Sequence, residues 1–147
     1  DEAAYSFAIR GVGAASAYMV VLGGSKLDQA IESGDTTPSA DDSTDFGQSG
    51  LQTAPVTRTF AICNYGSMTL NLTANPYIQI TGPNASDFVV ETMPTGSIAR
   101  DGGSATFVLR LHATALGLRR ATVHIHSNDP SHTDFTFDVQ GLGVNVT

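Results

Sequence analysis

Apolar and polar residues alternate with a period of two along most of this chain. In one such segment, Phe107, Leu109 and Leu111 are separated by Val108 and Arg110. Because successive side chains of a β-strand point to opposite faces, this alternation predicts strands with one face in a core and the other toward solvent. The same pattern recurs in segments 5–9, 59–62, 69–72, 78–80, 122–126 and 135–140.

Turn-forming residues separate these segments. Gly, Pro, Asn and Asp cluster at 64–66, 81–84, 101–103 and 127–130, which indicates tight turns. No segment keeps a period of 3.6 residues for three helical turns. The polar segment 33–55 predicts a long surface loop with a short strand near Phe46. Short strands with frequent turns predict an all-β fold, an antiparallel β-sandwich.

Charge and composition narrow the function classes. The 147 residues suit one domain with its own core. The formal net charge of −7 argues against a nucleic-acid-binding protein, because few basic side chains are present to neutralise phosphates. Six acidic residues and no Lys or Arg lie between Asp28 and Asp45, while the other eight acidic residues face seven basic ones. The body of the sandwich is therefore expected to be nearly neutral.

The sequence gives two expectations about membranes and processing. No run of about 18 apolar residues is present, so no membrane span is expected. The sequence starts at Asp1 without a recognisable signal peptide. We therefore expect either a processed mature protein or an excised fragment.

One strand sequence occurs twice, near the two ends of the chain. Residues 5–13 read YSFAIRGVG, and residues 135–143, 130 positions later, read FTFDVQGLG. Both copies end in a Gly-apolar-Gly sequence, where glycine allows a β-bulge or a positive φ. A single sandwich needs this strand once. We therefore divide the chain into an N-terminal strand, residues 1–14, and a sandwich domain, residues 15–147.

Several segments together resemble a known family. The segments are GDTTPSADDSTDFG (34–47), VTRTFAICNYGSMTLNL (56–72), ITGPNASDFVV (80–90), GGSATFVLRLHATALGLRRATV (102–123) and ATVHIHSNDPSHTDFTFDVQGLG (121–143). They resemble ASH (abnormal-spindle/hydin)-type immunoglobulin-like domains, including the bacterial extracellular "choice-of-anchor D" repeat. The resemblance implies an immunoglobulin-like antiparallel sandwich of about seven to nine strands in secreted or cell-surface proteins. The resemblance also implies a role in scaffolding or partner binding, and it implies no catalytic residues. Residues 4–13 depart from the family pattern.

The duplicated strand allows two interpretations. In one, the chain is a repeat cut from a tandem array. In the other, which we favour, the chain is a subunit of an extracellular filament or surface array, and residues 4–12 add as a donor strand to a neighbouring copy. An unpaired alternating strand would otherwise be an aggregation hazard. The interface would then contain Tyr5, Phe7, Ile9, Gly11, Val12 and Gly13.

A second function class stays open. The chain can instead be an adhesive or spacer module of a larger secreted protein that binds a glycan or protein through its loops. Cys63 has no sequence partner that would activate it as a nucleophile. The sequence also lacks the G-x-S-x-G motif of serine hydrolases. An enzyme is therefore not expected.

The acidic segment is the candidate cation site. Asp35, Asp41, Asp42 and Asp45 offer the oxygen ligands that Ca²⁺ prefers. Their spacing does not match an EF-hand, and aspartates in such loops also cap turns. Apart from this Ca²⁺ site, no cofactor is expected.

The histidines offer an incomplete metal site. His124 and His126 lie two residues apart and so share a strand face, with His112, His132 and Cys63 elsewhere in the chain. A structural zinc site needs four ligands, so metal binding at this pair is not expected from the sequence.

Three sequons are candidate glycosylation sites. They begin at Asn71, Asn84 and Asn145. Asn71 alternates with two leucines and is predicted to point outward, and Asn84 lies in a predicted turn. Both are expected to be accessible to glycosylation in a secreted protein, although such sequons also arise by chance in a chain rich in Ser and Thr.

Overall fold

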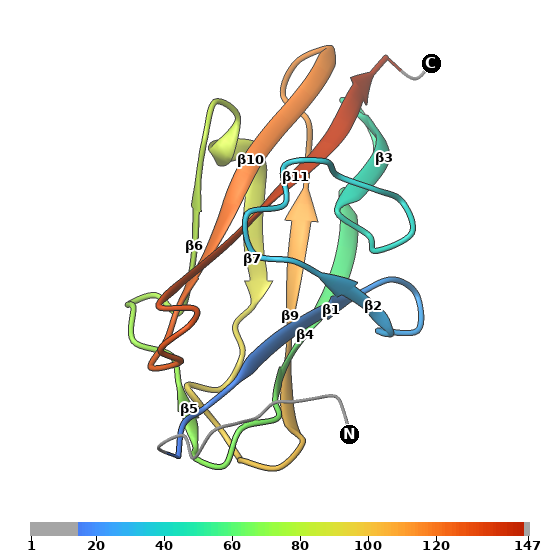
Figure 1. Ribbon diagram of the computed structural model, residues 1–147. Helices are drawn as coiled ribbons and strands as arrows, with labels where there is room; N and C mark the ends of the chain where they lie inside the picture. Colours follow the sequence, from blue (N-terminus) through green and yellow to red (C-terminus); the bar gives the residue numbers. More distant parts are fainter. Residues whose placement is uncertain (1–14, 146–147) are drawn as a thin grey trace.

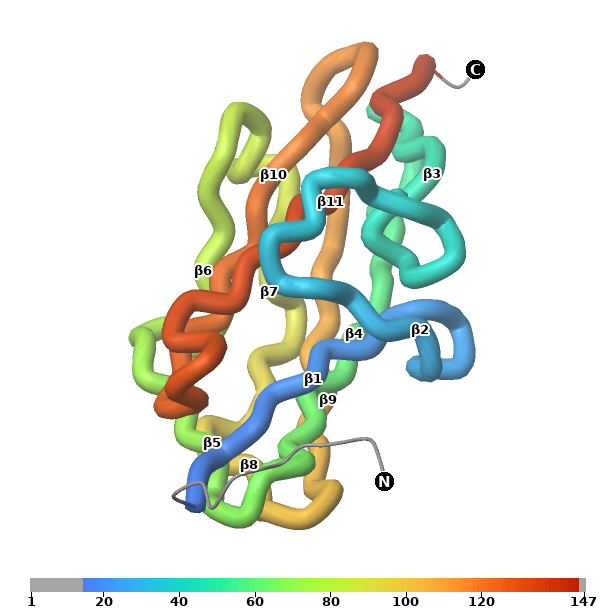
Figure 2. The backbone as a smooth tube through the Cα atoms, in the orientation of Figure 1, coloured from blue at the N-terminus to red at the C-terminus, as the bar shows by residue number. Residues whose placement is uncertain are grey.

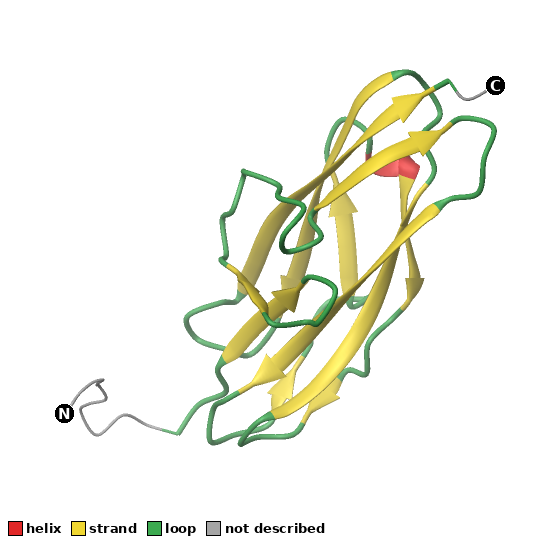
Figure 3. Cartoon of the chain, turned by 90° about the vertical axis from the view of Figure 1, so that its right-hand side faces the viewer, coloured by secondary structure: helices red, strands yellow, loops and turns green. Residues whose placement is uncertain are grey.

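A computed structural model describes residues 15–145 as two β-sheets packed face to face. The five-stranded sheet has the order β2 (Gln29–Ile31), β1 (Met19–Gly23), β4 (Val56–Asn64), β9 (Gly103–Leu111) and β7 (Phe88–Thr92). The four-stranded sheet has the order β3 (Asp45–Gly50), β11 (Asp134–Val144), β10 (Gly117–His126) and β6 (Ile78–Thr81). A small ladder joins β5 (Leu70–Asn71) to β8 (Ser97–Ile98), and a short 3-10 helix, η1, spans Ala85–Asp87 (Figure 3).

This architecture confirms the predicted all-β, immunoglobulin-like sandwich. Within the two sheets, the ladders between neighbouring strands are antiparallel except the parallel pairing of β3 with β11. The first part of the chain therefore contributes β1 to one sheet and β3 to the other. Phe46 lies in β3 and is buried, so the predicted loop from 33 to 55 contains the short core strand expected near Phe46.

The core lies between the sheets and uses the apolar positions of the alternation. Phe60, Phe107 and Phe137 are almost completely buried. The ring of Phe60 lies 5.5 Å from that of Phe107 and 5.7 Å from that of Phe137, measured between centroids. Phe60 and Phe107 come from one sheet and Phe137 from the other, so this aromatic group joins the two sheets.

β11 is paired along both of its edges. It is antiparallel to β10 from the pair Gly117–Gly143 to the pair His126–Asp134. On its other side it runs parallel to β3. β11 contains residues 135–143, the second copy of the repeated strand. This strand position is thus already occupied within the sandwich.

Close contact, and not positive φ, explains the glycines of β11. A Cβ at Gly141 would collide with the side chain of Leu111, and one at Gly143 would collide with the carbonyl oxygen of Ala115. Neither glycine is among the positive-φ residues of the described chain. Of the two possibilities expected at this motif, a bulge or a positive φ, the positive φ is not the one found, and here glycine provides space for neighbouring atoms.

The bulge in this ladder belongs to β3. Gln140 pairs with Asp45, whereas Leu142 pairs with Gln48, so the extra residue lies on β3. Gly47 has a φ of 76° at this point, a value that favours glycine. The expected bulge is thus present beside the Gly-apolar-Gly motif, on the partner strand.

The two ends of the described chain lie at opposite ends of the sandwich. β1 starts at the lower end in Figures 1 and 2, and β11 finishes at the upper end. The predicted donor-strand residues Tyr5, Phe7, Ile9, Gly11, Val12 and Gly13, and with them the predicted unit 1–14, lie outside the described residues.

We predict that Gly143→Ala destabilises the sandwich by about 1–3 kcal/mol, because the added methyl group forces the backbone at Ala115 to move. Urea unfolding followed by circular dichroism measures this change. Leu142→Ala is the matched control, since Leu142 is exposed and surface changes usually stay within about 0.5 kcal/mol. Equal stabilities of the two variants would contradict the close-contact explanation.

Candidate functional site

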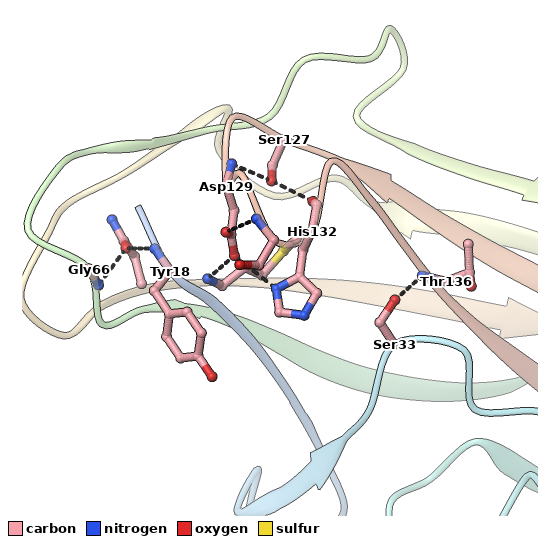
Figure 4. Close-up of polar contacts among 10 residues, drawn as sticks. Tyr18, Ser33, Gly66, Ser127, Asp129, His132 and Thr136 are labelled. Atoms are coloured by element: carbon pink, nitrogen blue, oxygen red, sulfur yellow. Dashed lines mark hydrogen bonds and ion pairs between the residues drawn. The ribbon is translucent and has the colours of Figure 1, made fainter. Parts of the chain in front are cut away.

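Two buried polar side chains fix the start of β1. Asn64 Oδ1 accepts hydrogen bonds from the backbone N–H of Tyr18 at 3.1 Å and of Gly66 at 3.0 Å. Asp129 Oδ2 accepts the N–H of Met19 at 2.8 Å and lies 2.9 Å from Nδ1 of His132 (Figure 4). Asn64 and Asp129 are buried, and the bond from Met19 to Asp129 is protected from water. The direction in which the chain enters the sandwich is therefore fixed.

Exposed apolar residues gather at this same end. Tyr18, Tyr65 and Met68 are exposed by 48%, 58% and 50%. The N–H of Tyr65 donates to the carbonyl of Tyr18 at 2.9 Å, and the carbonyl of Met68 accepts a bond from Asn64 Nδ2 at 2.8 Å. These three residues form what we call the N-terminal end surface.

A second apolar surface lies at the opposite end. Leu118 of β10 and Leu142 of β11 are directly paired, and Leu116 precedes β10. Their exposures are 51%, 42% and 59%. These three residues form the C-terminal end surface. Sequence reasoning missed it, although Leu118 and Leu142 are apolar residues in the solvent-facing phase of their strands, which is a detectable signal.

A buried ion pair positions the loop that carries Leu116. Asp87 Oδ2 accepts a hydrogen bond from Nε of Arg119 at 2.8 Å. Thr114 donates to the same carboxylate through its N–H at 3.1 Å and its hydroxyl at 2.8 Å. Burial acts to raise the pKa of Asp87, but the bonds from Thr114 and Arg119 outweigh it and the pKa is lowered. Asp87 thus holds η1, the 112–116 loop and β10 together.

We predict that Asp87 makes the free energy of unfolding depend on pH in the acidic range. Its folded-state pKa lies below the ordinary 3.8, so its contribution is complete above pH 3.8 and is lost as the pH falls through the folded value. Asp87→Asn should therefore lower the free energy of unfolding at pH 7 by about 1–3 kcal/mol and flatten its decline below pH 3.8. Chemical unfolding between pH 2 and pH 7 measures both, with exposed Asp101→Asn as control. An unchanged pH profile in Asp87→Asn would contradict this role.

Three of the four aspartates of the predicted calcium site accept hydrogen bonds from residues of local turns. Oδ1 of Asp35 accepts from Thr37, and Oδ1 of Asp42 accepts from Thr44. Oδ1 of Asp45 accepts from the N–H of Gly47. The structure does not bring Asp35, Asp41, Asp42 and Asp45 into one group of converging ligand atoms. Within residues 15–145, the convergent group of such side chains is a different one.

That convergent group contains the two predicted histidines and one residue that the sequence did not single out. His124 and His126 of β10 lie beside Asp134 of β11. His112 is exposed at the end of β9, and His132 contacts Asp129. Cys63 is buried on β4. Asp134 joins the histidines only because β10 pairs with β11. No local motif in the sequence predicts this pairing.

The sequon asparagines lie in hydrogen-bonded positions. Asn71 is exposed, as predicted, and its Oδ1 accepts a bond from Ser97. Oδ1 of Asn84 accepts from the N–H of Arg120, and Oδ1 of Asn145 accepts from Gln52. Glycosylation at these positions stays a prediction.

A shallow depression of about 790 Å³ lies between the acidic segment and β4. Its lining includes Asp41, Arg58 and the hydroxyl-bearing residues Ser25, Thr57 and Thr59. Polar side chains of both charges therefore line this depression. No helix among residues 15–145 is long and apolar enough to cross a membrane.

Comparison with known proteins supports the fold. No protein-family model matches the chain, and a search of curated proteins also gave no match. A crystal structure of a protein of unknown function from Porphyromonas gingivalis W83 is similar, with a TM-score of 0.60 and 18% identity over 89% of this chain and 50% of that one. This chain thus spans about half the length of that protein.

Two further solved structures show lower similarity. The ASH/PapD-like domain 7 of human CEP192 gives a TM-score of 0.46 and 12% identity, with 100% of both chains covered. Vibrio cholerae VesB protease gives 0.45 and 15% identity over 67% of this chain and 30% of that one. Because both TM-scores are below 0.5, the shared sandwich fold rests on the Porphyromonas protein.

Proposed function

We propose that this chain is a structural subunit of an extracellular filament or surface array, whose copies join head to tail by β-strand addition. One observation carries the proposal. Residues 5–13 repeat the sequence of β11, yet β11 in this sandwich already has β10 on one edge and β3 on the other. The second copy of this strand has no place left in that ladder. A neighbouring sheet is the alternative partner.

β7 is the edge that best fits such a strand. It ends the five-stranded sheet, and Val89 on it is 42% exposed, so an added strand would cover apolar surface. β7 is antiparallel to β9, and Phe88 pairs with Leu111. A strand added antiparallel to β7 therefore runs in the direction of β9. It would leave the sheet where β9 ends, close to the loop that carries Leu116.

This path brings the two end surfaces together. After residue 13, only residues 14–18 remain before β1 begins at Met19. Five extended residues span roughly 17 Å. The donor's N-terminal end surface must then lie near the acceptor's C-terminal end surface. Both surfaces are apolar, so their contact would remove apolar area from water. Such a heterologous contact between copies generates an open filament.

We predict that the full chain assembles and that deletion of residues 1–13 leaves a monomer, with a mass somewhat below the 15.3 kDa of the full chain. Light scattering coupled to size exclusion and negative-stain electron microscopy measure assembly. Val89→Lys should also block it, because a charge on the accepting edge opposes strand pairing. Gln29→Lys, on the opposite edge strand β2, is the matched control and should assemble normally.

Two results would overturn the proposal. The first is a monodisperse monomer of the full chain at all concentrations tested. The second is the persistence of unchanged filaments after deletion of residues 1–13. Circular dichroism of each variant separates loss of assembly from loss of folding.

A second candidate function is an adhesive or spacer module of a larger secreted protein. The depression beside Arg58 and Asp41 favours it, because charges of both signs with neighbouring hydroxyl groups suit a polar ligand such as a glycan. A monomeric full chain that binds immobilised glycans, and loses binding in Arg58→Ala, would support this module instead of the filament.

A further inference from the structure

Three potential metal ligands meet on the outer face of the β10–β11 hairpin. His124 and His126 lie two residues apart on β10, and the residues between and before them, Ile125 and Val123, are buried. Asp134, the first residue of β11, is directly opposite His126. The strand alternation therefore turns both imidazoles to the side of the sheet that carries Asp134.

The ligand atoms converge. Oδ1 of Asp134 lies 3.3 Å from Nδ1 of His124 and 3.8 Å from Nε2 of His126. All three atoms lie within 4.8 Å of one another. The two imidazole planes are nearly parallel, at 10°, with ring centroids 6.2 Å apart. One carboxylate oxygen thus faces a nitrogen from each histidine.

The contact between His124 and Asp134 is a long hydrogen bond, and its length also suits two ligands of a shared cation. A charge-assisted N–H to carboxylate bond is about 2.7–2.9 Å long. Ligands around a tetrahedral Zn²⁺, at about 2.0–2.1 Å from the ion, lie about 3.3–3.4 Å from each other. The contact between His124 and Asp134, at 3.3 Å, already has this spacing. Metal binding therefore requires His126 to move toward both other ligands, because its Nε2 lies 3.8 Å from Oδ1 of Asp134 and the ligand atoms of the group lie up to 4.8 Å apart.

A neighbouring strand orients one of the imidazoles. Oγ1 of Thr81, on β6, lies 2.8 Å from Nε2 of His124. When Nε2–H donates to this hydroxyl, the lone pair of Nδ1 points at Asp134. Metal-binding histidines commonly use their second ring nitrogen in this way, which fixes the tautomer and the ring orientation. Thr81 is therefore a positioning residue for the group.

The group is open to ions from solvent. The side chains of His124, His126 and Asp134 are exposed by 23%, 33% and 45%. Three protein ligands leave a position for water or for a group from a partner. Imidazole with carboxylate suits zinc and neighbouring divalent transition metals better than Ca²⁺ or Mg²⁺.

We propose that His124, His126 and Asp134 form a binding site for one divalent transition-metal ion, which Zn²⁺ represents in the test below. None of its residues belongs to either end surface, so the proposal does not rest on the head-to-tail assembly. The sequence interpretation found only two of its ligands, so it did not anticipate the site.

Isothermal titration of the full chain, without a histidine tag, with Zn²⁺ alone tests the proposal. We expect one Zn²⁺ per chain. His126→Gln and Asp134→Asn should each weaken binding at least tenfold, and Thr81→Val should weaken it roughly 10–100-fold through the lost orientation of His124. His112→Gln is the matched control, since His112 is exposed outside the group, and it should bind as the unaltered chain does.

A second readout follows the ligands directly. Co²⁺ bound by imidazole and carboxylate in a near-tetrahedral site gives intense visible absorption, which His124→Gln should abolish. The proposal is overturned by the absence of saturable Zn²⁺ binding in the unaltered chain. Unchanged affinity in both His126→Gln and Asp134→Asn would also overturn it. Circular dichroism confirms that each variant is folded before titration.

Discussion

The double pairing of β11 is the constraint on which the rest of this sandwich depends. β10 pairs with it along one edge and β3 along the other, and Phe137 on its inner face packs against Phe60 of the opposite sheet. The chain must therefore cross from one sheet to the other between β1 and β3. The glycines at 141 and 143 reflect packing as well as pairing, because Leu111 of β9 and Ala115 of the loop before β10 occupy the space beside them.

The fold could be predicted from the sequence because the period of two is a local signal. The alternation within each segment predicts which side chains face the core. Phe107, Leu109 and Leu111 are all buried as expected. The role of Gly143 could not be found in this way, since it depends on Ala115, which reaches it only through tertiary packing. The convergence of Asp134 with the histidines likewise depends on the register between two strands.

Buried polar groups occur in this sandwich where the chain changes direction. Asp129 and Asn64 hold the start of β1, and Asp87 holds the loop before β10. Each accepts hydrogen bonds from backbone N–H groups, and the buried N–H of Met19 without its partner Asp129 would cost about 1–3 kcal/mol. The two end surfaces are therefore presented on fixed backbone, as a specific contact between rigid bodies requires.

The placement of the start of β1 and the end of β11 at opposite ends of the sandwich has a mechanical consequence. Tension applied through β1 and β11 acts along the strands (Figure 1), whereas the hydrogen bonds of antiparallel ladders lie across them. Such a force shears many bonds of the β1–β4 and β10–β11 ladders at once instead of opening them one after another. A sandwich pulled in this direction resists extension through the collective strength of whole ladders.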